Sequence, residues 1–199
     1  MIRILGLSGS LRNGSYNSAL LQAAQGLMPA DVELIAGSIA GIPLYNGDDE
    51  AATGIPPAVQ ELKDQIAAAD GLLLFTPEYN NSIPGVFKNA IDWASRPAKD
   101  MGRVFGGKPV AVLGASPGGF GTILSQDAWL SVLRTLGTRP WHEGRLTVAR
   151  AGNVFDDQSR MTDAQMRDRL KNFLDGFAAF VGAPSGCVAA AVAIDDANR

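Results

Sequence analysis

The chain repeats one pattern several times: a short apolar run, a polar loop, and then apolar residues at helical spacing. The apolar runs lie at 2–7, 32–36, 72–75 and 110–113, and another strand is expected within 138–149. Short runs that are apolar throughout are typical of parallel strands covered on both faces. Strands that alternate with helices predict an α/β protein in which helices flank both faces of one parallel sheet.

Five strands joined by right-handed crossovers favour the sheet order 2-1-3-4-5, which is that of a flavodoxin-like three-layer sandwich. In such sheets a ligand binds outside the carboxyl ends of the strands, where the strand order reverses. The polar loops at 9–18, 76–82 and 114–122 follow strands 1, 3 and 4. We therefore expect these three loops to converge on one crevice and to form the ligand-binding site.

The first of these loops, GSLRNGSYNS at 9–18, lies between a strand and an amphipathic helix. Backbone N–H groups and the positive end of the helix dipole make such a position suitable for a phosphate. Arg12 can pair with the phosphate charge, and hydroxyl and amide side chains can donate to its oxygens. The alternative is an ordinary capped helix start in a Gly/Ser turn. The candidate phosphate ligands are Ser8, Ser10, Arg12, Ser15, Asn17 and Ser18.

The other two loops carry groups that suit a flat polar ring. Tyr79 offers an aromatic face, Asn80 offers a donor and an acceptor, and Glu78 adds a carboxylate. Gly118 and Gly119 allow the backbone to approach such a ring closely. The alternatives are that Tyr79 packs on its own loop, that Glu78 is a charge at a helix start, and that the glycines form a flexible turn. A phosphate site beside a ring site predicts a mononucleotide such as FMN as the ligand.

Composition argues against several other classes of protein. The net charge of −3, without a basic block, argues against nucleic acid as a partner. The single cysteine, Cys187, allows no internal disulfide, so a reducing compartment such as the cytoplasm is expected. We see neither a signal-peptide pattern nor an apolar run of membrane-spanning length. His142 is the only histidine and no cluster of ligands accompanies it, so no metal site is expected.

The length of 199 residues is that of one domain. We expect 1–183 to form a single FMN-binding domain and the alanine-rich segment 184–199 to be a mobile tail.

The segment 37–50 contains Gly, Pro, Asn and Asp without a helical period, which predicts a loop. Its apolar residues Ile42, Leu44 and Tyr45 either fold back on the core or line a pocket wall or a subunit contact. The second interpretation is favoured, because loops at strand ends form binding surfaces.

Four segments resemble the NADPH-dependent FMN reductase family, and within it the bacterial NAD(P)H:quinone oxidoreductases, also described as chromate or azo-dye reductases. They are GSLRNGSYN at 9–17, IPLYNGDDE at 42–50, PEYNNSIPGVFKNAIDW at 77–93 and SPGGFG at 116–121. The resemblance implies FMN-binding residues in all three loops. It assigns the FMN phosphate to Ser10, Arg12, Ser15, Tyr16, Asn17 and Ser18, the ribityl chain and ring to Pro77, Glu78, Tyr79 and Asn80, and the other side of the ring to Ser116, Gly118 and Gly119.

The activity that the resemblance implies is transfer of two electrons from NADPH or NADH, through bound flavin, to small-molecule acceptors such as quinones, chromate, azo dyes or free flavin. The cofactor supplies this chemistry. No catalytic acid or base is expected, and a structural role is favoured for Glu78, the nearest candidate. Members of the family are commonly homodimers or homotetramers, which predicts a homo-oligomer.

Two alternatives remain open. One is a flavodoxin-type electron carrier without NAD(P)H turnover. Arg12 and the modest net charge argue against it, because carriers dock through a strongly acidic surface. The other is a protein of the same fold that binds no flavin.

Overall fold

The computed structural model describes residues 1–183 and contains one parallel sheet. Its strand order is β2-β1-β3-β4-β5, with β6 paired to β4, so the predicted order is confirmed and one further strand is present. The mobile tail predicted at 184–199 lies outside the described residues. The strands are β1 (Ile2–Ser8), β2 (Val32–Gly37), β3 (Gly71–Phe75), β4 (Pro109–Ala115), β5 (Arg139–Pro140) and β6 (Leu146–Val148).

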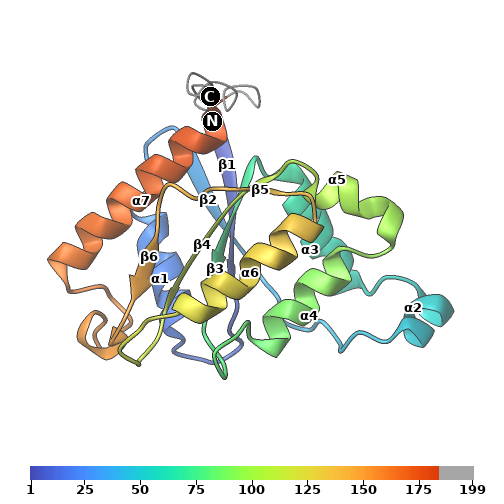
Figure 1. Cartoon of the computed structure of the whole chain (residues 1–199), viewed down its shortest axis with the longest axis horizontal. Coiled ribbons are helices and arrows are strands. Elements are labelled where there is room, and N and C mark those ends of the chain that lie inside the picture. The colour runs from blue at the N-terminus through green and yellow to red at the C-terminus, as the bar shows by residue number, and fades with distance from the viewer. Residues whose placement is uncertain (184–199) are drawn as a thin grey trace, which may run out of the picture.

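Helices cover both faces of this sheet and give three layers (Figure 1). Successive side chains of a strand point to opposite faces, so Leu73 joins the core cluster under α1 and α7, whereas Leu72 and Leu74 join the cluster under α3, α4 and α6. Within the described residues, no helix is both long and apolar enough to cross a membrane. The helices are α1 (Tyr16–Gln25), α2 (Gly47–Thr53), α3 (Pro57–Ala68), α4 (Gly85–Ala94), α5 (Met101–Phe105), α6 (Ile123–Thr135) and α7 (Ala164–Gly182), with short 3₁₀ turns at Ala98–Asp100 and Ala151–Asn153.

The edge of the sheet beside β4 differs from the prediction of one strand within 138–149. β5 pairs with the start of β4, and β6 pairs with its end. The N–H of Trp141 donates to the carbonyl of Val110 at 2.8 Å. Beyond this hydrogen bond, the backbone between β5 and β6 leaves the sheet. The indole of Trp141 is buried edge-on against Phe173 of α7. Burial of this side chain accompanies the break in the strand.

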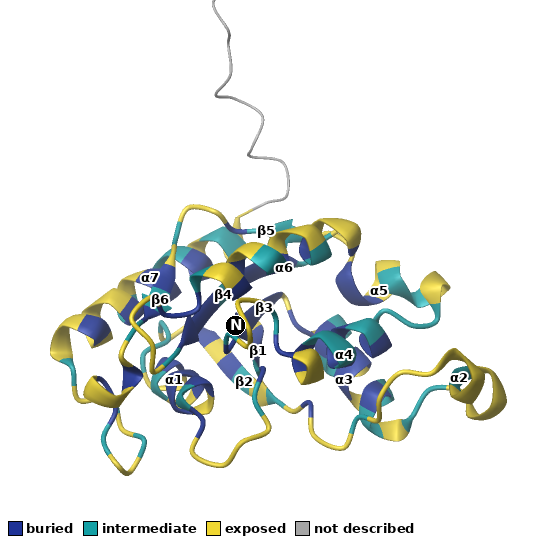
Figure 2. Cartoon of the chain, turned by 60° about the horizontal axis from the view of Figure 1, so that its bottom comes forward, coloured by how far each residue is buried: buried dark blue, intermediate teal, exposed yellow. Residues whose placement is uncertain are grey.

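The segment 37–50 was expected to be a loop, and this is wrong for its last part, where α2 begins. Asn46 caps the helix, since its Oδ1 accepts a hydrogen bond of 3.0 Å from the N–H of Asp48. No residue of α2 is buried, so the helix lacks the apolar period that would have revealed it (Figure 2). Of the apolar residues before it, Ile42 packs on the core, whereas Leu44 is 81% exposed.

A buried lysine fastens α3 to the connection between α4 and α5. Lys63 is fully buried. Its ammonium group donates to the carbonyl of Arg96 and to the carboxylate of Asp100, the latter at 2.9 Å. A buried charge is tolerated only when it is paired and hydrogen-bonded, so these partners explain how a lysine can occupy this position. The connection that Lys63 contacts contains a 3₁₀ turn at Ala98–Asp100 and α5.

Candidate functional site

The loops that follow β1, β3 and β4 meet at the carboxyl end of the sheet, as predicted. β1 runs downward from the N-terminus in Figure 1, so these loops gather at the lower edge of the molecule. They enclose a cleft of about 500 Å³, within the range typical of ligand-binding pockets. The lining residues are Ser10, Arg12, Ser15, Tyr16, Asn17, Pro77, Glu78, Tyr79, Ala115, Ser116 and Pro117.

Most residues predicted for the site therefore line one cleft, but five do not. Ser8, Ser18, Asn80, Gly118 and Gly119 are absent from its lining. The cleft also includes Ala115 and Pro117, which the sequence reasoning missed. Neither side chain has a polar group that could have drawn attention to it; the only signal was their position on either side of Ser116.

Ser15 shows that the phosphate and helix-cap interpretations of the first loop are compatible. It caps α1, because its Oγ accepts hydrogen bonds from the N–H groups of Asn17 and Ser18 at 3.2 and 3.4 Å. Capping uses the lone pairs of the hydroxyl and leaves its O–H group as a donor. Ser15 can thus cap the helix and donate to a ligand at the same time.

Arg12 supplies the positive charge of the cleft. Its guanidinium lies 5.9 Å from the centre of the Tyr16 ring and donates to the carbonyl of Gly14 at 2.8 Å. Among the residues that the structure describes, Arg12 forms no ion pair. Its remaining N–H groups, beside the positive end of the α1 dipole, favour an anionic ligand.

The side chains of Asn17 and Ser18 make hydrogen bonds within the protein. Asn17 is only 3% exposed. Its amide donates to the carbonyl of Ala115 and accepts from the N–H of the same residue, both at 2.9 Å. The hydroxyl of Ser18 is hydrogen-bonded to that of Ser8 at 2.9 Å. These side chains connect parts of the protein to one another.

Glu78 also turns toward the protein. Its Oε2 accepts hydrogen bonds from the N–H groups of Leu124 and Ser125, at 2.8 and 3.0 Å, in the first turn of α6. A carboxylate is stabilised at this end of a helix by the dipole and the free N–H groups. The alternative that Glu78 is a charge at a helix start is therefore correct in part, although the helix is α6 and not the one that follows its own loop.

A buried polar cluster supports the wall on which Glu78 lies. The hydroxyl groups of Thr76 and Ser125 are 2.9 Å apart and both residues are fully buried. The indole N–H of Trp129 donates to the Thr76 hydroxyl at 3.1 Å. Gly114 lets the neighbouring loop pass close by, since a Cβ there would lie 2.1 Å from the Thr76 carbonyl oxygen. These buried contacts fix the wall of the cleft between β3 and α6.

Tyr79 presents its ring at the mouth of the cleft. It is 48% exposed, so the alternative of an aromatic packed on its own loop is wrong. Its backbone pairs with that of Ser82 across a tight turn, with both hydrogen bonds at 3.1 Å. Asn80 and Asn81, within the turn, have φ of 49° and 62°. Asparagine tolerates this left-handed region better than most residues, and Asn80 is absent from the cleft lining.

The third loop contributes Ser116 through a local turn. The Ser116 hydroxyl accepts a hydrogen bond of 3.0 Å from the N–H of Gly118. The carbonyl of Gly118 accepts from the N–H of Arg150 at 2.9 Å, which fixes the loop against the segment after β6. Gly118 and Gly119 therefore shape the loop without lining the cleft.

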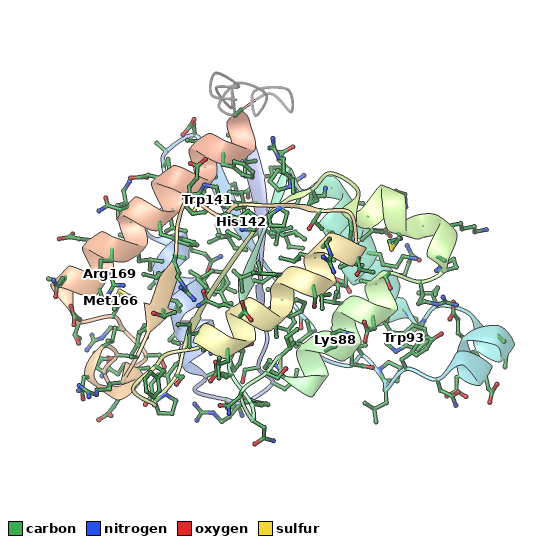
Figure 3. All side chains as sticks on the ribbon, viewed as in Figure 1. Lys88, Trp93, Trp141, His142, Met166 and Arg169 are labelled. Carbon is green, nitrogen blue, oxygen red and sulfur yellow. The ribbon has the colours of Figure 1, made fainter. Side chains whose placement is uncertain are left out.

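His142 lies away from this cleft, in the segment between β5 and β6 beside Trp141 (Figure 3). It lines a separate hollow of about 300 Å³ together with Asp127. No group of three or more histidine, cysteine, aspartate or glutamate side chains that could hold a metal ion occurs within 1–183.

A cation at a helix N-terminus, an aromatic ring and a cleft at the switch point of the sheet define a mononucleotide-binding protein with the flavodoxin-like fold. A family model described as NADPH-dependent FMN reductase matches residues 2–153. The chain is 48% identical, over 180 residues, to an NAD(P)H-dependent FMN reductase of Pseudomonas aeruginosa, covering 90% of this chain and 95% of that protein.

Two further relatives agree with this match. A 2-hydroxy-1,4-benzoquinone reductase of Burkholderia is 38% identical, covering 90% of this chain and 96% of that protein. The solved structure of FerB, a flavoenzyme NAD(P)H:(acceptor) oxidoreductase from Paracoccus denitrificans, has a TM-score of 0.81 and 34% identity and covers 91% of this chain and 97% of its own. The chain belongs to the NADPH-dependent FMN reductase family.

Family membership confirms the predicted class of activity and cofactor. The protein is an enzyme, a flavin-dependent oxidoreductase that uses FMN and NAD(P)H. The two alternatives from the sequence, an electron carrier without NAD(P)H turnover and a protein without flavin, are therefore set aside.

Proposed function

We propose that the protein transfers two electrons from NADPH or NADH, through FMN bound in the 500 Å³ cleft, to quinones. One observation carries the placement of FMN: the guanidinium of Arg12, at the N-terminus of α1, lines the same cleft as the ring of Tyr79 and the loop of Ser116. One cavity thus provides a cation that can hold a phosphate, together with an aromatic ring and a loop that can border the flavin ring.

The residues present fit FMN by the chemistry of their donors. The charged residues of the lining are Arg12 and Glu78. Because Glu78 is held by two N–H groups of α6, its charge is partly compensated, and Arg12 faces the cleft without an acidic partner among the described residues. Hydroxyl donors at Ser10 and Ser15 add to this cation. A phosphate dianion finds a charge-assisted partner here.

The chemistry of the reaction comes from FMN, which when bound accepts two electrons from a nicotinamide and passes them to an acceptor. The protein's own side chains bind and orient the flavin. Arg12 and the hydroxyl groups hold the phosphate end, whereas Tyr79 and Ser116 border the space for the ring. We propose no catalytic acid or base, since the one carboxylate of the lining, Glu78, is engaged by α6.

We propose quinones as the acceptors because one relative that is 38% identical over most of both chains is a 2-hydroxy-1,4-benzoquinone reductase. Planar acceptors can also stack in a cleft bordered by an exposed aromatic ring such as that of Tyr79. Chromate, azo dyes and free flavin are further candidate acceptors, since a flavin that is open on one face reduces many compounds.

We also propose that residues 1–183 act as one FMN-binding domain and that the protein works in the cytoplasm as a homodimer or homotetramer. Exposed apolar side chains near the cleft support association: Phe120 is 84% exposed, and Tyr79, Leu124 and Val86 are also exposed. Tyr79 lines the cleft and Leu124 is hydrogen-bonded to Glu78 of its lining, and exposed apolar side chains in such places favour a protein–protein contact. Light scattering on an eluting size-exclusion peak gives the subunit number, and a monomer would contradict this part.

The experiment that tests the proposed function is a visible spectrum of the purified protein, reconstituted with FMN, before and after anaerobic NADPH. The expected result is a flavin spectrum that bleaches with NADPH and returns when a benzoquinone is added. A flavin spectrum that does not bleach with NADPH or NADH would contradict the enzyme proposal. Bleaching without reoxidation by quinone would leave the cofactor and the donor in place and contradict only the acceptor.

A further inference from the structure

One hydrogen-bonded pair in the site joins two loops that the sheet itself does not join. β1 and β4 are separated by β3, so no backbone ladder connects the loop after β1 to the end of β4. Asn17, in the first turn of α1 that follows this loop, reaches across. Its amide nitrogen donates to the carbonyl of Ala115 and its Oδ1 accepts from the N–H of Ala115, both at 2.9 Å.

The backbone of Ala115 needs this partner. The β3–β4 pairing ends at Phe75 opposite Leu113, and the last bond of the ladder runs from the N–H of Thr76 to the carbonyl of Leu113. Ala115 lies beyond it and is almost fully buried, at 2% exposure. Buried backbone N–H and C=O groups without partners are costly. The amide of Asn17 therefore takes the place that a continuing β3 would have occupied.

We propose that Asn17 is a positioning residue for the flavin ring and not a ligand of the phosphate. It holds Ala115, and with it the adjoining wall at Ser116 and Pro117, at a fixed distance from the base of α1. All three of these residues line the cleft, and Ser116 is one of the residues assigned to the ring. This inference rests on the proposed placement of FMN. It assigns to a residue of the phosphate loop an effect on the opposite end of the ligand.

The two roles predict different responses to a flavin that lacks the phosphate. Riboflavin carries the same ring and ribityl chain as FMN. Loss of a phosphate ligand weakens FMN binding alone, whereas displacement of the ring wall weakens FMN and riboflavin by the same factor. We therefore compare the dissociation constants of both flavins, measured by quenching of flavin fluorescence, in wild type, Asn17→Ala and Arg12→Ala.

For Asn17→Ala we expect both dissociation constants to rise about tenfold, with their ratio as in wild type, because the variant loses the two buried hydrogen bonds that hold Ala115. For Arg12→Ala we expect a rise for FMN alone. An Asn17→Ala protein that loses FMN affinity and keeps riboflavin affinity would overturn the inference. So would affinities unchanged for both flavins in a folded variant, because a merely structural residue would lower the melting temperature without changing either constant.

Circular dichroism and thermal unfolding establish that each variant is folded at the temperature of the titration. If Asn17→Ala does not fold, Asn17→Ser keeps a small donor and acceptor at the position, and the same ratio applies to it. Failure of the proposed placement of FMN is distinguishable from failure of this inference, since in that case Arg12→Ala as well as Asn17→Ala would leave the dissociation constant of FMN unchanged.

Discussion

Replacing Glu78 with glutamine separates a structural role of this carboxylate from a catalytic one. The Glu78 carboxylate accepts from the N–H groups of Leu124 and Ser125, at 2.8 and 3.0 Å, at the positive end of α6. Glutamine keeps an oxygen acceptor of the same size and removes the charge. A charge at a partly exposed helix terminus contributes about 0.3–1 kcal/mol. For a domain of this size, the melting temperature of Glu78→Gln should fall by roughly 1–4 °C.

Turnover is the second measurement on this variant. A general acid or base contributes about 10²–10⁴-fold to the rate, so kcat would fall by that factor if Glu78 transferred a proton. We expect kcat of the FMN-loaded Glu78→Gln enzyme to stay within about threefold of wild type, as for a change worth about 0.5 kcal/mol. The assay is steady-state oxidation of NADPH with a saturating benzoquinone.

The matched control for Glu78→Gln is Asp127→Asn, which neutralises an exposed carboxylate of α6 that is not part of the cleft lining. We expect this variant to retain both the wild-type melting temperature and the wild-type kcat. A hundredfold fall in kcat for Glu78→Gln, at an unchanged melting temperature, would refute the structural assignment of Glu78 and identify it as a catalytic residue.

Three other predictions concern binding, stability and pH. Arg12→Ala should weaken FMN about 10–100-fold, because a hydrogen bond to a charged group contributes about 1.5–3 kcal/mol; equal FMN affinity in a fluorescence titration would contradict the phosphate placement. Lys63→Met should lower the free energy of unfolding in urea by roughly 1–3 kcal/mol, because the carbonyl of Arg96 loses its buried donor; an unchanged urea midpoint would contradict it. The hydrogen bond from Arg96 lowers the pKa of Glu50 below its ordinary value of 4.5, so this interaction stabilises the fold above about pH 4.5 and is lost as pH falls through the folded-state pKa. The melting temperature of Glu50→Gln should therefore fall less than that of wild type when the pH is lowered below 4.5. An equal fall in the two proteins would contradict this prediction.

The sheet could be predicted because its strands are buried on both faces. Every residue of β3 is buried, so the strand appears in the sequence as a continuous apolar run that needs no knowledge of its neighbours. The order of the strands then follows from general rules of chain connection. The position of the cleft follows in turn from the strand order.

Elements held by distant contacts could not be predicted in this way. α2 buries no residue, and its Glu50 is fixed by an ion pair of 2.8 Å with Arg96, which is 46 residues away in the sequence. Trp93 of α4 holds the segment before α2 by donating to the carbonyl of Pro43 at 2.9 Å, and Figure 3 shows its side chain on that side of α4. The local spacing of apolar residues in the sequence does not indicate such contacts.

The same limit explains why the sequence predicts which loops form the cleft but not what each of their polar side chains contacts. A polar side chain in a loop has hydrogen-bonding capacity, but the sequence does not show whether it uses that capacity on a ligand or on the protein. Asn17 uses it on Ala115, and Glu78 uses it on α6. These hydrogen bonds within the protein hold the walls of the cleft that carry Arg12 and Tyr79. A binding site requires such supporting residues to fix its walls. We therefore expect substitutions of the inward residues to change flavin affinity through the geometry of the cleft, and substitutions of Arg12 to change it through charge alone.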